Sequence, residues 1–174
     1  MQDGNLVALI QSSQYSRCEQ APGNTRNQQG RNNMAKRLSV IDTERCVGCQ
    51  ACMFACVRRT GSGGLDESCI HVHSAGGIRK GFVVIVCRAC PSPPCAKVCP
   101  TDALIEREGG GVKLKASLCI GCGNCVEACP FGAVMWSNAT NKPQICIYCG
   151  YCADYCPYDV LALEDLEEAV HAAE

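Results

Sequence analysis

The stretch CIGCGNCVEACP, residues 119–130, decides how this chain is organised. It places four cysteines within eleven residues and follows the last one with a proline. Thiols crowded this closely are joined in disulfides, bind zinc, or hold a larger metal cluster. The rest of the sequence shows how well each of these three possibilities fits.

The same device occurs four times along the chain. The four runs are CVGCQACMFAC (46–56, run 1), CRACPSPPCAKVCP (87–100, run 2), CIGCGNCVEACP (119–130, run 3) and CIYCGYCADYCP (146–157, run 4). Sixteen of the eighteen cysteines lie in these runs. Of the remaining two, Cys18 lies in a polar leader and is expected to have no function, and Cys69 is expected to be a small buried residue.

The composition indicates a reducing compartment. The 174 residues carry 16 basic and 17 acidic side chains, a balance that gives no reason to expect binding to nucleic acid. The first residues lack a basic start, and their apolar run LVALI is too short for a signal peptide. The run FVVIV at 82–86 is too short to span a membrane. We therefore expect a cytoplasmic protein without a membrane span, in which dense cysteines bind metal more often than they cross-link.

The spacing within each run favours a [4Fe–4S] cluster. In C-x2-C-x2-C the chain curls tightly and directs three thiolates toward one compact object, here from Cys119, Cys122 and Cys125. The fourth thiol, Cys129, points away, and Pro130 suits that reversal because proline fixes φ and cannot continue the local hydrogen bonding. Three ligands from one run and one from another is the arrangement of two-cluster ferredoxins.

Zinc and disulfides fit this spacing less well. Structural zinc usually takes two C-x2-C knuckles that are well separated in sequence, whereas each run here bunches its cysteines. A disulfide scaffold is unsuited to a reducing compartment. The four runs predict four [4Fe–4S] clusters, which in so short a chain indicate a conducting row.

The sequence also predicts roles for the glycine and apolar residues beside the cysteines. Gly48 and Gly121 precede the second cysteine of their runs, where the absent Cβ permits a tight turn and lets backbone N–H groups approach sulfide. Three apolar residues each follow the first cysteine of a run and are expected to exclude water. These are Val47, Ile120 and Ile147.

The hydrophobic patterning predicts an α+β fold built from short hairpins and short helices. Residues 1–37 are predicted to be a disordered extension, because residues 1–33 are polar and show no periodicity, and residues 38–160 are predicted to form the cluster-binding domain. Residues 161–174 are predicted to form an amphipathic C-terminal helix. The glycine-rich segments SAGGIRKG (74–81) and EREGGGVK (106–113) are predicted to be hairpin turns.

Runs 1 to 3 carry a family resemblance. Run 2 has the spacing C-x2-C-x4-C-x3-C-P, and with its neighbours it resembles the four-cluster electron-transfer subunits of molybdenum and tungsten oxidoreductases, such as the iron–sulfur subunit of dimethyl sulfoxide reductase. The resemblance covers about residues 38–165 and implies tandem bacterial-ferredoxin-like modules. Two features depart from it: Val57 replaces the proline of the other runs, and run 4 lacks a long insertion. The second departure favours the polyferredoxin subunits of tungsten enzymes of the aldehyde ferredoxin oxidoreductase type, such as class II benzoyl-CoA reductase.

The resemblance also implies which cysteines share a cluster, although spacing alone would equally allow neighbouring runs to pair. The family pairs its first run with its fourth, and its second with its third. Carried onto this chain, this pairing gives four quartets, each a set of four cysteines that would bind one cluster. Quartet 1 is Cys46, Cys49, Cys52 and Cys156, and quartet 2 is Cys146, Cys149, Cys152 and Cys56. Quartet 3 is Cys87, Cys90, Cys95 and Cys129, and quartet 4 is Cys119, Cys122, Cys125 and Cys99.

Three functions are compatible with the sequence. The first is an electron-transfer subunit that carries single electrons between a larger catalytic subunit, holding tungsten or molybdenum, and an external carrier or further electron-transfer subunits. The second is a free-standing polyferredoxin, and the third is a structural zinc-binding interaction module. The chain contains no nucleophile–base pair, phosphate loop or dinucleotide fingerprint, so we expect no substrate site of its own.

Four further residues have open roles. Cys69, His71 and His73 alternate in SCIHVHS, so they would share one strand face, and the histidines are expected to be ordinary surface or interface groups rather than metal ligands. The single tryptophan, Trp136, follows run 3 and is expected to pack in the core or beside a cluster.

Overall fold

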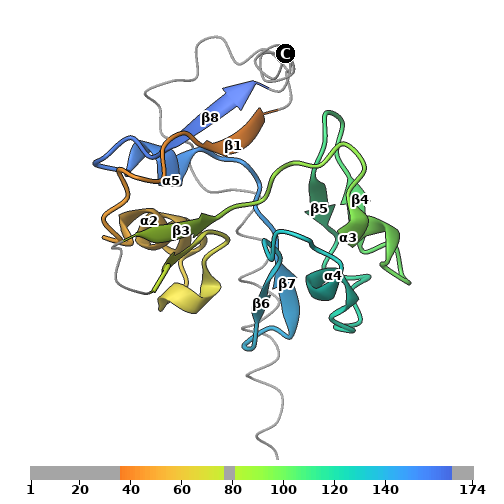
Figure 1. Ribbon diagram of the computed structural model, residues 1–174. Coiled ribbons are helices and arrows are strands. Elements are labelled where there is room, and N and C mark those ends of the chain that lie inside the picture. The colour runs from red at the N-terminus through yellow and green to blue at the C-terminus, as the bar shows by residue number, and fades with distance from the viewer. Residues whose placement is uncertain (1–35, 77–80, 166–174) are drawn as a thin grey trace, which may run out of the picture.

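The structure, a computed structural model, describes residues 36–76 and 81–165 (Figure 1). Short strands and short helices alternate along this part of the chain, which confirms the predicted α+β class. In chain order the elements are β1 (Lys36–Val40), α2 (Ala51–Thr60), the 3-10 helix η3 (Leu65–Glu67), β2 (His71–Ser74), β3 (Phe82–Ile85), α3 (Pro94–Lys97), β4 (Leu104–Glu106), β5 (Val112–Leu114), α4 (Asn124–Glu127), β6 (Met135–Ser137), β7 (Lys142–Gln144), α5 (Tyr151–Asp154) and β8 (Leu161–Asp165).

The described strands form four antiparallel pairs of two strands each. Three of the pairs, β2–β3, β4–β5 and β6–β7, join strands that are consecutive in the chain. The two glycine-rich segments that were predicted to be turns connect β2 to β3 and β4 to β5, which confirms both hairpins. The β6–β7 hairpin was not predicted, because its strands are only three residues long and one contains Pro143.

The fourth pair joins the two ends of the described chain and corrects one prediction. β1 pairs with β8, so that Leu38 lies opposite Leu163 and Val40 opposite Leu161. Residues 161–165 are therefore a strand and not the start of a helix, because the alternating leucines there have a partner strand that lies far away in sequence. The other residues of the predicted helix, 166–174, lie outside the described residues.

The start of the domain also differs slightly from its predicted position. β1 begins at Lys36, two residues before the predicted boundary, and residues 1–35 of the predicted extension lie outside the described residues. Two cross-strand ion pairs hold the start of β1 to β8: Lys36 Nζ lies 3.3 Å from Asp165, and Arg37 Nη2 lies 3.2 Å from Glu164. Because all four side chains are partly exposed, each pair contributes at most about 1 kcal/mol.

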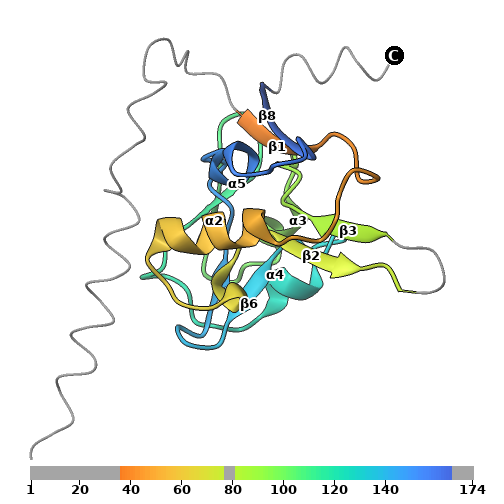
Figure 2. The ribbon, with the colours of Figure 1, turned by 90° about the vertical axis from the view of Figure 1, so that its left-hand side faces the viewer.

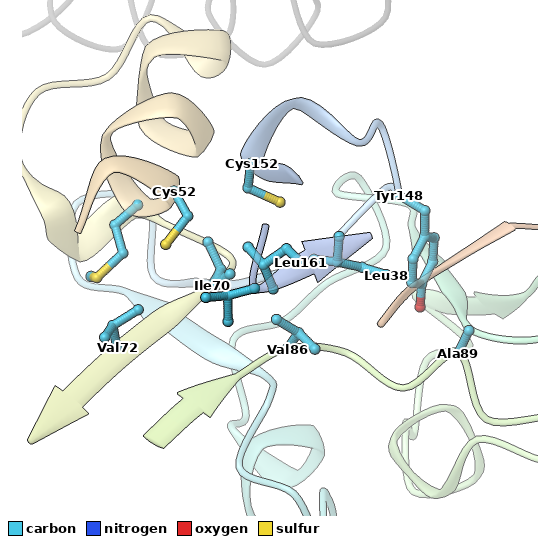
Figure 3. Close-up of a cluster of buried hydrophobic side chains, with 11 residues drawn as sticks. Leu38, Cys52, Ile70, Val72, Val86, Ala89, Tyr148, Cys152 and Leu161 are labelled. Carbon is cyan, nitrogen blue, oxygen red and sulfur yellow. The ribbon is translucent and has the colours of Figure 1, made fainter. Parts of the chain in front are cut away.

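Two hydrophobic cores divide the described chain by sequence. The first gathers the ends of the chain, from Leu38 and Cys52 to Cys152 and Leu161 (Figure 3). The second gathers the middle, including Cys95, Leu104, Val112 and Cys125. Figure 1 shows the corresponding elements in two groups, with α2, α5, β1 and β8 on one side and α3, α4, β4 and β5 on the other. The fold therefore brings run 1 to run 4 and run 2 to run 3.

The helices reproduce this pairing of runs. Helix α2 of run 1 packs against α5 of run 4, and α3 of run 2 packs against α4 of run 3. Figure 2 shows α5 and α2 one above the other, with the β2–β3 hairpin beside them. No helix within residues 36–76 and 81–165 is long and apolar enough to cross a lipid bilayer.

Candidate metal centres

Three cavities are each lined by the four thiols of one quartet, and one of the three is lined by a fifth thiol, Cys146, as well. One is lined by the members of quartet 1 and has a volume of about 330 Å³, which, like the two volumes that follow, includes space open to solvent. A second, of about 320 Å³, is lined by quartet 4, and a third, of about 450 Å³, by quartet 3. Each of these cavities thus combines three cysteines of one run with the last cysteine of another run. This is the grouping that the resemblance implies, although neighbouring thiols alone do not establish which of them share a cluster.

The cysteines of quartet 2 are neighbours as well. Burial raises the pKa of Cys152 well above its ordinary value, and the adjacent charges of Cys146, Cys56 and Cys149, and of Cys52 in quartet 1, raise it further. A charge has this effect only at short range inside a protein. Cys146 also lines the cavity of quartet 3, so the two quartets approach each other there.

Several of the buried thiol groups that line the cavities favour their neutral forms. Burial raises the pKa of Cys52 and of Cys95 to about 11, and that of Cys146 to about 12. Nearby thiolates raise these pKa values further, because like charges disfavour one another. Since metals bind thiolates, a positively charged metal centre must replace these protons.

The donor set fits [4Fe–4S] clusters. All cysteines among the described residues are free thiols, so no disulfide joins any two of them. In the same residues, no group of three or more His, Cys, Asp or Glu side chains is close enough to hold a single metal ion. The thiols surround a volume instead of meeting at a point, which suits a cubane cluster with four thiolate ligands better than it suits zinc.

A left-handed residue precedes the second cysteine in every run. Gly48 and Gly121 have φ of 69° and 72°, as a tight turn there requires, and Ala89 and Tyr148 occupy the same position with φ of 50° and 55°. A Cβ at Gly48 would clash with the ring of Phe82. The sequence revealed only the glycines. The other two were missed because alanine and tyrosine rarely adopt this conformation, and aligning the four runs would have found them.

The fourth cysteine of three runs receives a backbone hydrogen bond. The amide of the residue four positions later donates to its Sγ, from Ala103 to Cys99 at 3.2 Å and from Ala133 to Cys129 at 3.3 Å. In run 4, Val160 donates to Cys156 at 3.4 Å. Such hydrogen bonds stabilise a thiolate and raise the potential of the cluster that it binds.

Run 1 obtains the same hydrogen bond in another way. Because it has Val57 in place of proline, helix α2 continues through Cys56 to Thr60. The donor to Cys56 Sγ is the amide of Cys69, thirteen residues later, at 3.3 Å. Hydrogen bonds from the Cys69 thiol and amide lower the pKa of Cys56 to about 6. Cys69 is thus adjacent to a predicted ligand, a position that its sequence context did not reveal.

The apolar residues that follow the first cysteine of three runs were expected to exclude water, but their side chains are exposed. Val47 is 50% exposed, Ile120 64% and Ile147 49%. Val47 and Ile120 nevertheless line the cavities of quartets 1 and 4, beside the thiols. They are exposed because the short loop that turns the thiols inward directs the intervening side chains outward.

The structure places both histidines and the tryptophan whose roles the sequence left open. The ring centroids of His71 and His73 are 5.5 Å apart, and burial lowers the pKa of His71. Trp136 lines the cavity of quartet 4, beside the thiols and not only in the core. Cys18 lies outside the described residues.

Two residues near quartet 3 were not predicted. Tyr148 is 6% exposed, and its hydroxyl lies 2.9 Å from Cys87 Sγ. The guanidinium carbon of Arg107 lies 4.5 Å from the centroid of the Tyr148 ring. No local pattern signals this arrangement, because Cys87, Arg107 and Tyr148 come from three separate segments.

The comparisons with known proteins agree with this chemistry. Residues 78–166 match the family described as the 4Fe-4S dicluster domain, which is half of the chain and includes runs 2, 3 and 4. The chain belongs to this family. [4Fe–4S] clusters are accordingly the cofactor of this family member, and run 1 lies outside the matched region.

Several curated proteins are similar to this family member. A tetrathionate reductase subunit of Archaeoglobus fulgidus is 36% identical over 95 residues, which are 54% of this chain and 45% of that protein. The arsenate respiratory reductase iron–sulfur subunit of a Shewanella strain is 32% identical over 105 residues, 58% of this chain and 45% of that protein. The electron transport protein HydN of Escherichia coli is 36% identical over 107 residues, 56% of this chain and 58% of that protein. The chain spans about half the length of the curated relatives it matches.

Proposed function

We propose that the chain is an electron-transfer subunit in which quartets 1 to 4 hold four [4Fe–4S] clusters. Each cluster, when bound, accepts and releases one electron at a time. The observation that carries the proposal is the lining of three cavities by one quartet each. The proximity of the quartet 2 thiols supports the fourth cluster.

The two cores support an organisation into two ferredoxin-like modules. The outer module would contain runs 1 and 4 with the first core, and the inner module runs 2 and 3 with the second core. Cys146 lines the cavity of quartet 3 although it belongs to quartet 2. Electrons would therefore cross between the modules at this point, because distance governs the rate of tunnelling.

The protein's own residues would control the potentials and the access of water. Amides that donate to the fourth cysteine of each run stabilise the thiolate, as Ala103 does for Cys99. Cys49, Cys122 and Cys149 are exposed, so quartets 1, 4 and 2 each present one thiol at the surface. Electrons would enter and leave through such exposed edges.

A larger catalytic oxidoreductase subunit is the proposed partner, and it would hold tungsten or molybdenum. The half-exposed side chains of Val47 and Ile120 beside two cavities offer apolar surface for docking. The names of the relatives, which include a tetrathionate reductase subunit and an arsenate reductase iron–sulfur subunit, support a partner of this class. The compact run 4 favours tungsten, and the dense cysteines with metal-binding spacing favour a cytoplasmic location.

Anaerobic purification of the full chain from its native host tests the proposal. We expect a brown complex with a larger subunit at fixed stoichiometry, tungsten or molybdenum in that subunit, and clusters that are reduced when its substrate is added. Reducible clusters without any partner would favour the free-standing polyferredoxin. A colourless protein that contains zinc but neither iron nor inorganic sulfide would overturn both and favour the zinc module.

A further inference from the structure

Tyr148 lies at the junction between the two proposed modules. It belongs to run 4 and sits between Cys146 and Cys149 of quartet 2, yet its hydroxyl contacts Cys87 of quartet 3 at 2.9 Å. It is 6% exposed and packs in the first core, where Figure 3 shows it with Ala89 at one end of the cluster of side chains. One side chain thus joins the two quartets.

The backbone of Tyr148 is held in an unfavourable conformation. Its φ of 55° is left-handed, like that of Ala89 in run 2, whereas runs 1 and 3 place glycine at the same position. A left-handed conformation is unfavourable for a residue other than glycine, because its Cβ crowds the backbone. At this position the tyrosine side chain makes contacts that glycine or alanine could not supply.

Those contacts fix the hydroxyl group against the sulfur. The Arg107 guanidinium lies over the face of the ring, 4.5 Å from its centroid, in a cation–π arrangement. Gly111 lies directly beside the hydroxyl, where a Cβ would come within 3.0 Å of Tyr148 Cζ. The amide of Gly111 itself donates to the carbonyl of Cys90, at 2.9 Å, so the whole loop is tied to quartet 3.

The direction of the hydrogen bond follows from the chemistry of the acceptor. A thiolate that binds a cluster carries no proton, so the phenol must donate. A donated hydrogen bond withdraws charge from the sulfur and stabilises the reduced, more negative cluster relative to the oxidised one. The half-buried Arg107 cation acts in the same direction, because it also favours added negative charge.

We propose that Tyr148, held by Arg107, is a positioning residue that raises the reduction potential of the cluster bound by quartet 3 through its hydrogen bond to Cys87. The inference rests on the proposed function, since it requires that Cys87 is a cluster ligand. It assigns to one side chain of run 4 the control of a cluster in the other module. Electrons that reach the junction would thereby favour the quartet 3 side.

The test replaces Tyr148 by phenylalanine in the full chain and measures cluster potentials by anaerobic redox titration followed by electron paramagnetic resonance. Tyr148→Phe removes the hydroxyl and keeps the ring. We expect unchanged iron and sulfide, and one cluster whose equilibrium constant for reduction falls about tenfold, a shift of roughly −59 mV. The other clusters should keep their potentials.

Two further variants make the result specific. Tyr155→Phe is the matched control, because Tyr155 lies in the same run, is exposed and has its ring 5.1 Å from that of Tyr151. It should shift no potential. Arg107→Met removes the cation while keeping similar bulk, and it should lower the potential of the same cluster by a smaller amount.

Several outcomes would overturn the inference. These are unchanged potentials in Tyr148→Phe, an equal shift in Tyr155→Phe, or loss of a cluster in Tyr148→Phe, which would make the hydroxyl part of the scaffold. A wild-type chain that lacks four reducible clusters would instead refute the proposed function. The two failures are therefore distinguishable.

Discussion

Run 1 and the three runs that follow it solve the same problem with different local structures. In runs 2, 3 and 4 the short helix ends before the fourth cysteine and a proline follows that cysteine. A left-handed residue three positions after the cysteine then turns the chain back. These residues are Asp102, Gly132 and Asp159, with φ of 51°, 59° and 49°. The next amide then donates to the sulfur of the fourth cysteine.

Run 1 has no such turn, and a long-range contact replaces it. Helix α2 spans ten residues, from Ala51 to Thr60, and the donor to Cys56 comes from a loop after η3. Ser68 stabilises this loop through its buried hydroxyl, which donates to the carbonyl of Ile70 at 2.7 Å. The hydrogen bond to sulfur is thus the constant feature, whereas the local structure that supplies it varies.

The largest expected effect comes from removing the third cysteine in either region. Cys52→Ser in run 1 and Cys125→Ser in run 3 should each lose one cluster and about a quarter of the bound iron, because serine is a poor ligand for iron in such clusters. We expect the module concerned to become marginally stable. Iron and sulfide analysis of anaerobic preparations measures the loss.

The control for this prediction is Cys69→Ser, which should retain all clusters. The hydrogen bond that run 1 shares with the other runs is donated to Cys56 by the backbone amide of residue 69, which the substitution keeps. Four intact reducible clusters in Cys125→Ser would contradict the prediction. Loss of a cluster in Cys69→Ser would show that run 1 uses a thiol that the other runs do not need.

The next effect tests whether run 1 tolerates the ending of the other runs. Val57→Pro places proline inside α2 and should destabilise the fold by about 3 kcal/mol or more, since it removes a helix hydrogen bond and clashes with the preceding turn. The midpoint of anaerobic thermal unfolding should fall by roughly 10 °C. Val57 is 4% exposed, so Val57→Ala, the control, should cost only about 1.5 kcal/mol of lost burial. Equal stability of Val57→Pro and the wild type would contradict our account of run 1.

Ser68→Ala should weaken the loop that serves run 1 alone. Ser68 is fully buried, and its hydroxyl also accepts a hydrogen bond from the Ile70 amide at 3.2 Å, so its removal leaves a buried amide unpaired. The expected cost is about 1–3 kcal/mol. The Cys69 amide should move away from Cys56, so the potential of one cluster should fall.

Redox titration of Ser68→Ala beside Ser117→Ala, an exposed serine next to run 3, measures this effect. The control should shift neither the unfolding temperature nor any potential. If all four potentials move together in Ser68→Ala, the loop does not act on run 1 specifically.

The smallest expected effect is in a run that ends in Cys-Pro. Pro130→Ala should cost about 0.4–1 kcal/mol, chiefly because the unfolded chain gains freedom. The turn itself should persist, because the Gly132 amide donates to the Cys129 carbonyl at 3.0 Å and the Ala133 amide donates to the Cys129 sulfur. Differential scanning calorimetry should show a fall of a few degrees. A fall as large as that of Val57→Pro would mean that proline, and not the amide network, defines these runs.

The sequence predicted the features that depend on local spacing. The four runs, the α+β class and the two glycine-rich hairpin turns are all readable from residues close together in the chain. The cluster type follows in the same way, because C-x2-C-x2-C can direct three thiolates to one object without help from distant segments. Which runs contribute cysteines to the same quartet depends on tertiary structure, and it was predicted only through the family resemblance.

The features that sequence missed depend on distant partners. Residues 161–165 form a strand because β1 supplies a matching edge, which no local pattern reveals. Cys69 meets Cys56, and Tyr148 meets Cys87, only after the chain folds. The left-handed Tyr148 contradicts its local preference, and such conflicts between local and global structure are expected at functional sites.

The metal content of the anaerobically purified full chain shows whether every quartet binds a cluster. We expect about sixteen iron ions and about sixteen sulfide ions per chain, with paramagnetic signals of reduced [4Fe–4S] clusters after addition of dithionite. About half that content would contradict the assignment of a cluster to every quartet. A folded chain that contains zinc and no inorganic sulfide would contradict the account as a whole.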